Sequence, residues 1–248
     1  MRDPRDFQIA SLLALNLYGL VALDFEVRPG VAATLLATAL AAQWAGTRWA
    51  GLLRFDPKSA LVSGLGLCML LRTASPGWAA LAAALAIGSK FAIRLRGKHV
   101  FNPTDFALVA LLACGAPVWV SPGQWGSEAF LGFLAACCAF LVLHRSERSD
   151  VTVAFLVAWT ALLVGRSLWL AEPMAIPLHR LENGALLIFA FFMISDPKTI
   201  PDSRPGRLLF AGMVASGAFF VQFGLFRTNG LLYSLAASAL LVPLIDLL

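Results

Sequence analysis

Two short polar clusters interrupt a very apolar sequence, and the first has the residue types of a ligand site. Residues 97–105 (GKHVFNPTD) place Asn102 directly before Pro103, as in a helix N-cap followed by proline at the first helical position. A helix beginning there presents backbone N–H groups and the positive end of its dipole, with Lys98 nearby in sequence. The cluster predicts a site for an anion or for the polar edge of a cofactor. An ordinary capped helix beside a basic loop is the alternative.

The second cluster, residues 194–207 (ISDPKTIPDSRPGR), combines charged residues with three X–Pro steps. Residues before proline avoid the helical region, so the segment is expected to be extended and poor in hydrogen bonds. Asp196 falls at the expected end of a helix, where the dipole disfavours a carboxylate. Lys198, Arg204 or Arg207 could neutralise it. A purely structural turn is the alternative here.

The remaining reactive residue types predict neither a metal site nor an enzyme that acts alone. The cysteines fall in apolar runs without zinc or iron–sulfur spacing, and the histidines lie near expected loops. These residues are Cys68, Cys114, Cys137, Cys138, His99, His144 and His179. The sequence also contains no recognisable nucleophile–base arrangement.

The elements that must position both clusters are transmembrane helices. Hydrophobic residues make up 59% of the 248 residues and charged residues 13%, and the mean hydropathy is +0.79. A helix needs about 20 mostly apolar residues to cross a bilayer, and we expect about ten spans in an all-α integral membrane protein. The spans are expected at 7–23, 29–45, 59–71, 76–93, 104–120, 127–143, 151–170, 181–195, 207–223 and 229–247, and the fifth could be re-entrant instead.

Charge distribution gives the expected orientation. With ten spans, 14 of the 19 Lys and Arg residues fall on the side that carries both termini. The positive-inside rule places that side in the cytoplasm, so we expect a multi-pass protein of the inner membrane with both termini cytoplasmic. The net charge of +5 then reflects loops that face the anionic lipids of the bilayer, and it does not indicate nucleic acid binding.

A faint internal repeat divides the expected single transmembrane domain (1–248) into halves, 1–121 and 122–248. Residues 91–113 resemble 219–241, since both run apolar helix, basic residue, asparagine, apolar helix. Residues 59–72 similarly resemble 181–196. Halves of five helices are inverted in the membrane, so we expect a five-plus-five inverted repeat with broken helices.

At the two clusters the sequence resembles the NqrB/RnfD family, which comprises membrane subunits of Rnf-type electron transport complexes and of the sodium-pumping NADH:quinone oxidoreductase. The likeness extends from about residue 59 to the C-terminus and includes the tail 229–246. The matching cluster residues are Gly97, Lys98, Phe101, Asn102, Pro103, Asp196, Pro197, Thr199, Pro201, Gly206 and Arg207.

This resemblance implies a scaffold related to urea and ammonium channels, an intramembrane flavin, and electron transfer with redox partner subunits and possible ion coupling. The cofactor-binding candidates that it implies are Lys98, Asn102, Pro103, Asp196, Thr199 and Arg207. The family's threonine motif for covalent FMN is absent, and residues 73–76 (TASP) have the wrong order. The resemblance therefore favours non-covalent riboflavin or FMN, or no cofactor.

Two other functions fit the same sequence. A small-solute or ion channel or transporter suits an inverted-repeat scaffold, because a fold does not by itself decide function. A membrane anchor or assembly subunit would use residues 196–207 as a docking surface for a partner enzyme. Flavin content, solute uptake by the protein alone, and co-purification of a soluble partner distinguish the three.

Overall fold

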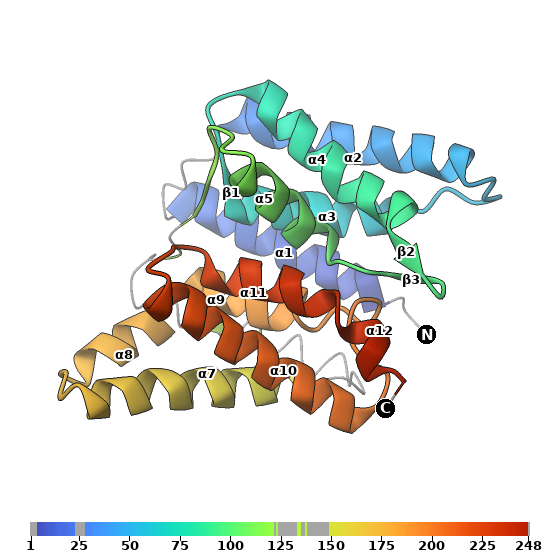
Figure 1. The fold of residues 1–248 in the computed structure, drawn as a ribbon. Coiled ribbons are helices and arrows are strands. Elements are labelled where there is room, and N and C mark those ends of the chain that lie inside the picture. The colour runs from blue at the N-terminus through green and yellow to red at the C-terminus, as the bar shows by residue number, and fades with distance from the viewer. Residues whose placement is uncertain are drawn as a thin grey trace. The chain divides into compact units, whose positions relative to one another are not determined.

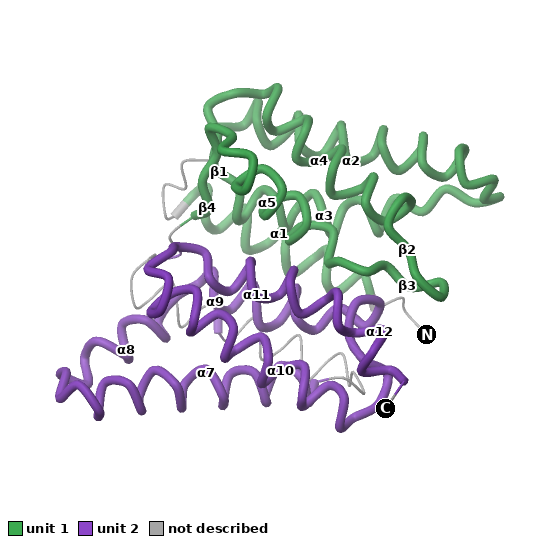
Figure 2. Tube along the Cα trace, viewed as in Figure 1, with its two compact units in different colours: residues 1–121 green, residues 122–248 purple. Residues whose placement is uncertain are grey.

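The computed structural model describes residues 4–22, 28–121, 123, 133, 134, 137 and 149–247 (Figure 1). The chain forms two compact units, residues 1–121 and 122–248 (Figure 2). The described part of each unit is mainly helical, which confirms the all-α class. That the whole chain is one transmembrane domain stays a prediction.

Unit 1 has five helices among its described residues. They are α1 (Pro4–Ala22), α2 (Pro29–Trp49), α3 (Pro57–Leu70), α4 (Pro76–Ala92) and α5 (Pro103–Ala113). Helices α2 to α5 carry a proline in the first turn, where its missing N–H costs no helical hydrogen bond. α3 lies at the centre, since α1, α2, α4 and α5 all pack against it.

Extended segments follow the two short helices of unit 1 and pair with each other. β1 (Leu71–Arg72) follows α3, β4 (Trp119–Val120) comes after α5, and they are antiparallel with Leu71 opposite Val120. The expected span 104–120 is therefore wrong in its second half, because α5 ends at Ala113 and the chain turns at Gly115, which has a φ of +68°. α5 is too short to cross a bilayer by itself.

Unit 2 has a similar order, in which a short helix, a segment of turns, a long helix and an asparagine precede the next helix. Its described helices are α7 (Ser149–Trp169), α8 (Ala175–Leu181), α9 (Gly184–Ile188), α10 (Arg204–Phe219), α11 (Gly230–Ala239) and α12 (Val242–Ile245), with π-helical turns η1 (Phe189–Met193) and η2 (Phe220–Gly224). α10 packs against α7 and α11. The inverted orientation of the halves stays a prediction.

One expected span of unit 2 is shortened and another is interrupted. The span expected at 181–195 is the α9–η1 helix alone, residues 184–193, and the Ala190 carbonyl in η1 accepts a hydrogen bond from the Thr152 hydroxyl at 2.8 Å. The span expected at 229–247 breaks at residues 240–241 into α11 and α12, where Pro243 has no N–H for a continuous helix.

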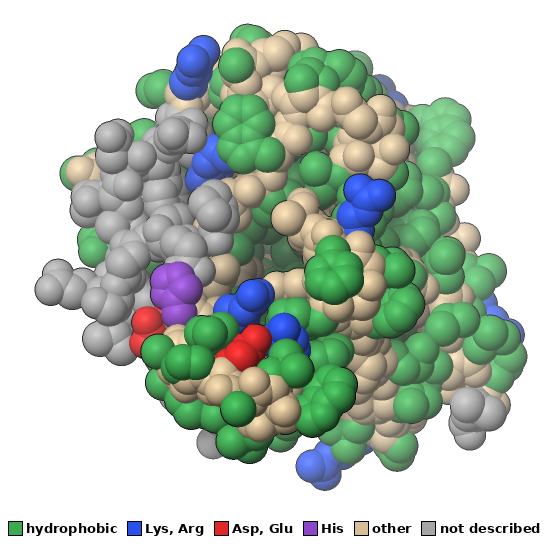
Figure 3. Space-filling model, turned by 60° about the vertical axis from the view of Figure 1, so that its left-hand side comes forward, with side chains coloured by type: hydrophobic (Ala, Val, Ile, Leu, Met, Phe, Trp, Pro, Cys, Tyr) green, Lys and Arg blue, Asp and Glu red, His purple; other side chains and the backbone are tan. Residues whose placement is uncertain are grey.

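Two helices in the described part of the chain, Ser149–Trp169 and Arg204–Gly224, are long and apolar enough to cross a membrane by length and composition. α7 buries Phe155 and Trp159 yet exposes Val153 and Val157, so it is apolar on both faces as a helix in lipid is. Hydrophobic side chains also dominate the face in Figure 3.

The expected total of ten spans stays a prediction. Four further apolar helices are shorter: Pro57–Leu70, Pro103–Ala113, Gly184–Met193 and Gly230–Ala239. The expected span 127–143 falls almost entirely outside the described residues. Short apolar helices joined by extended segments are tolerated at membrane depth only where protein covers the backbone, so these elements fit a scaffold of broken helices.

Candidate functional site

The first polar cluster forms the beginning of α5, and its cap is confirmed. Asn102 has extended backbone angles, and its Oδ1 accepts hydrogen bonds from the N–H groups of Thr104 at 3.1 Å and Asp105 at 3.2 Å. Pro103 occupies the first helical position and has no N–H to satisfy. The N–H groups that would otherwise bind an anion at this helix start are thus used by the Asn102 side chain.

Lys98 lies just before this helix in a short hairpin. β2 (Arg94–Leu95) and β3 (Lys98–His99) are antiparallel, with Leu95 opposite Lys98, and Gly97 makes the turn with a φ of +83°. His99 ties the hairpin to α4, because its Nδ1 is 3.1 Å from the Lys90 carbonyl oxygen. Lys98 is half-buried and therefore precedes the α5 start on an ordered element.

Replacing Asn102 by alanine is expected to lower the free energy of unfolding by about 1 kcal/mol, since two N–H groups lose their acceptor. Denaturant unfolding of the purified protein in detergent measures the change. Asn102→Ser is the matched control, because serine is also a good cap. Equal losses for both variants would show that the amide stabilises the protein by another contact.

The second polar cluster begins with a tight turn after η1. The Asp196 Oδ1 accepts a hydrogen bond from the Lys198 N–H at 3.0 Å. The Asp196 carbonyl accepts from the N–H of Thr199 at 3.1 Å and from its hydroxyl at 3.2 Å. Aspartate commonly closes turns in this way, so Asp196 and Thr199 are brought together by the local backbone.

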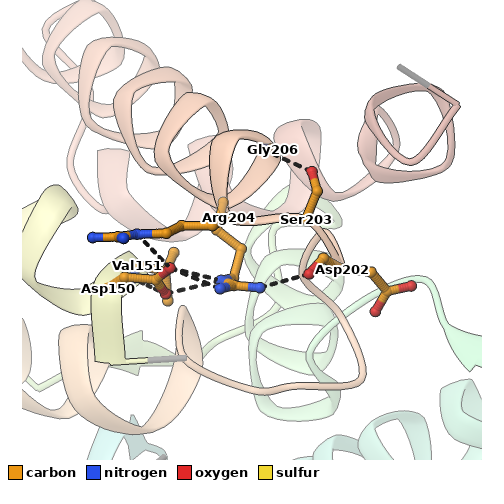
Figure 4. Close-up of polar contacts among 7 residues, drawn as sticks. Asp150, Val151, Asp202, Ser203, Arg204 and Gly206 are labelled. Carbon is orange, nitrogen blue, oxygen red and sulfur yellow. Dashed lines mark hydrogen bonds and ion pairs between the residues drawn. The ribbon is translucent and has the colours of Figure 1, made fainter. Parts of the chain in front are cut away.

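Arg207 joins α10 to α7 through an ion pair that the sequence did not reveal. Its Nε donates to Asp150 Oδ1 at 2.8 Å and its Nη2 to Asp150 Oδ2 at 2.8 Å, while Nη1 donates to the Asp202 carbonyl at 2.6 Å (Figure 4). The side chains of Arg207 and Asp150 are 10% and 15% exposed. A two-point arginine–carboxylate pair of low exposure fixes geometry as well as charge.

The chain on the N-terminal side of α10 is held from several directions. Ser203 caps the helix by accepting from the Gly206 N–H, and Asp246, just after α12, accepts from the Asp202 N–H at 2.8 Å. A Cβ on Gly206 would lie 2.9 Å from the Ile245 side chain, so only glycine allows this approach. Residues 194–207, the rigid segment from here on, are thus held by several hydrogen bonds. The expected extended, hydrogen-bond-poor character is wrong for residues 197–199, which form turns, and for residues 204–207, which begin α10.

The six candidate residues fall into two groups. Lys98, Asn102 and Pro103 lie together at the start of α5 in unit 1. Asp196, Thr199 and Arg207 lie in or beside the rigid segment of unit 2. Asp150, the ion-pair partner of Arg207, was not predicted from the sequence. The available signal was that an arginine between apolar helices needs a counter-charge.

The described part of the chain is all-α. Its long apolar helices, and its short helices that begin at prolines or after an asparagine cap, fit a membrane protein. The sequence profile of the NQR2, RnfD, RnfE family matches residues 115–248, which is more than half of the chain. The chain belongs to this family. The match contains the rigid segment 194–207 and the tail, whereas the start of α5 lies outside it.

Curated relatives are named as the D subunit of an ion-translocating oxidoreductase complex. A protein of Cronobacter sakazakii is 30% identical over 153 residues, which cover 60% of this chain and 41% of the relative. One from Salmonella arizonae is 32% identical over 110 residues, covering 43% and 30%, and one from Vibrio vulnificus is 28% identical over 123 residues, covering 50% and 34%. The chain thus matches less than half the length of these relatives.

Proposed function

We propose that the protein is the membrane subunit of an Rnf- or Nqr-like electron transport system, working with redox partner subunits and coupled to ion movement. The observation that carries the proposal is the family match over residues 115–248, together with the name of the relatives. The inner membrane, with both termini in the cytoplasm, is the proposed location. Electrons would enter and leave through partner subunits, since the described residues include no recognisable catalytic set.

A non-covalent flavin is the proposed cofactor, and the residues at the start of α5 fit its ring better than a phosphate. The Asn102 amide and the Lys98 ammonium are polar groups suited to a ring edge, and the Phe101 and Phe106 rings lie 5.3 Å apart beside them. The first free N–H groups of α5, which would hold a phosphate, donate to Asn102 instead. Riboflavin is therefore favoured over FMN.

The residues of the second group have a positioning role in this proposal. Arg207 uses its guanidinium nitrogens on Asp150 and the Asp202 carbonyl, and Asp196 and Thr199 close a turn. Together they hold the segment between η1 and α10 in one conformation. A bound flavin would supply the capacity to accept and donate electrons, while these residues would fix the protein surface near which partner subunits dock.

The test is the absorbance and fluorescence spectrum of the detergent-purified protein, before and after acid denaturation and filtration. We expect flavin bands near one flavin per chain, with the flavin leaving in the filtrate. Lys98→Gln is expected to lower the flavin content, whereas Arg54→Gln, an exposed cation in the same unit, leaves it unchanged. A colourless protein that also ignores added riboflavin would contradict the cofactor proposal.

Two further outcomes would redirect the function. Solute uptake into liposomes that contain the protein alone, without a redox partner, would favour a channel or transporter. Co-purification of a soluble partner that is lost on replacing the exposed Arg204 would favour an anchoring role, because Arg204 extends from the rigid segment with a side chain that is 78% exposed.

A further inference from the structure

Asp105, in the first turn of α5, is a buried carboxyl group whose charge nothing balances among the described residues. Its side chain has no exposed area, and neither carboxyl oxygen has a hydrogen-bond partner in that part of the chain. An ionised carboxylate in an apolar surrounding is costly, and such groups within membrane helices are usually functional. The positive end of the α5 dipole offsets only a small part of that cost.

The two lysines on the helices packed against α5 are engaged elsewhere. α3 carries Lys58, whose ammonium pairs with Asp6 at 2.7 Å, and the thiol of Cys68. α4 carries Lys90, which donates to the Ser59 carbonyl at 2.8 Å. Within the described part of the chain no ion pair joins any of them to Asp105, which is also the sole titratable residue of α5.

The polar groups beside Asp105 in sequence also have other partners. The Thr104 hydroxyl donates to the Ser63 carbonyl at 3.3 Å, and the Asn102 Oδ1 accepts from two backbone N–H groups. A metal cation would need several oxygen ligands around it. A proton needs a single carboxyl oxygen, so a proton is the ion that this environment suits.

We propose that the Asp105 carboxyl group is a proton-binding site inside unit 1. The group is a neutral carboxylic acid while it is enclosed, and it releases the proton as H⁺ to leave a carboxylate when water or a cation reaches it. The inference deepens the proposed function by naming the ion, and its coupling to electron transfer rests on that function. The binding site itself requires no flavin.

The test uses dicyclohexylcarbodiimide, which adds to protonated carboxyl groups in apolar surroundings. The full-length protein is reconstituted in liposomes, treated over a range of pH, and analysed by peptide mass spectrometry. We expect a stable adduct on Asp105 at neutral pH, declining in alkaline buffer as the proton is lost. Asp105→Asn should lose the adduct, while Asp56→Asn, which changes a 41% exposed carboxylate in the same unit, should retain it.

Infrared spectroscopy of the same samples covers the case in which the reagent cannot reach the site. The carbonyl band of a protonated carboxylic acid is expected in the wild type and absent from Asp105→Asn. Absence of both the adduct and the band would overturn the proposal. If Na⁺ at fixed pH prevented labelling of Asp105 and K⁺ did not, Asp105 would be a sodium site, and the proposal of a proton site would be overturned. Flavin content is measured in the same samples. A protein without flavin that still shows the adduct or the band would contradict the electron-transfer function and leave the proton site in place.

Discussion

Replacing Arg207 by methionine is expected to lower the free energy of unfolding by about 3–5 kcal/mol, the cost typical of breaking a buried ion pair by removing one partner. The variant leaves Asp150, 15% exposed, without the guanidinium that donates to both of its oxygens. It also removes the donor to the Asp202 carbonyl. Denaturant unfolding in detergent micelles, followed by far-ultraviolet circular dichroism, measures the loss.

Arg204→Met is the matched control, because Arg204 contacts the same carboxylate from solvent. Its Nε is 4.0 Å from Asp150 Oδ2 and its side chain is 78% exposed, so the expected loss is at most about 1 kcal/mol. Adding Asp150→Asn to Arg207→Met should recover part of the stability, since the unpaired charge is removed. Similar small losses for the two arginine variants would mean that this pair does not hold α7 to α10.

Replacing Gly230 by alanine is expected to lower the free energy of unfolding by about 1–3 kcal/mol, as overpacking of a close contact does. A Cβ at this position would lie 2.7 Å from the backbone carbonyl oxygen of Ala218, and backbone cannot rotate away as a side chain can. α11 would have to move from α10, on which it packs. Small residues at such crossings let membrane helices approach closely.

Gly212→Ala is the control for this substitution. Gly212 lies in the interior of α10, and a Cβ there would meet no atom within 4 Å. Alanine is expected to be neutral or to stabilise the helix by up to about 1 kcal/mol, because it restricts the unfolded chain more than glycine does. The same unfolding measurement separates the two variants, and a destabilising effect of equal size at Gly212 would refute the packing explanation for Gly230.

The ion pair changes how the second polar cluster relates to cofactor binding. The resemblance makes Arg207 a candidate for binding the flavin. Its hydrogen bonds instead go to Asp150 on α7 and to the Asp202 carbonyl, so its side chain links α10 to α7. Loss of flavin in Arg207→Met would therefore be read together with the loss of stability. Lys98→Gln removes a half-buried charge from a hairpin and is the cleaner probe of the cofactor.

Helix beginnings were largely predictable from sequence, and helix ends were not. Prolines at the starts of α2, α3, α4 and α5 mark positions where local stereochemistry alone decides the outcome. The end of α5 depends on a contact distant in sequence. The segment after α5 contains β4, which pairs with β1, the strand that follows α3. Hydropathy continues through that segment without a break, so the expected span 104–120 was too long.

The two asparagines of the internal repeat differ for a similar reason. Asn102 and Asn229 stand at equivalent places in the repeated sequence, but Asn102 caps its helix while Asn229 has a φ of +61° and makes no side-chain cap. Asparagine accepts either conformation readily. The choice follows from the chain on both sides, which is a short hairpin before Asn102 and the end of η2 before Asn229.

The sequence by itself determined the apolar helical character, the starts of the helices and the two polar clusters, because composition, proline and capping act over a few residues. Tertiary structure alone decided the partners within those clusters. Arg207 meets a carboxylate 57 positions away, and Asp105 is enclosed where no partner among the described residues reaches it. Local spacing carries no information about such contacts, since they depend on which helices pack together, and burial then sets how strongly each charge must be balanced.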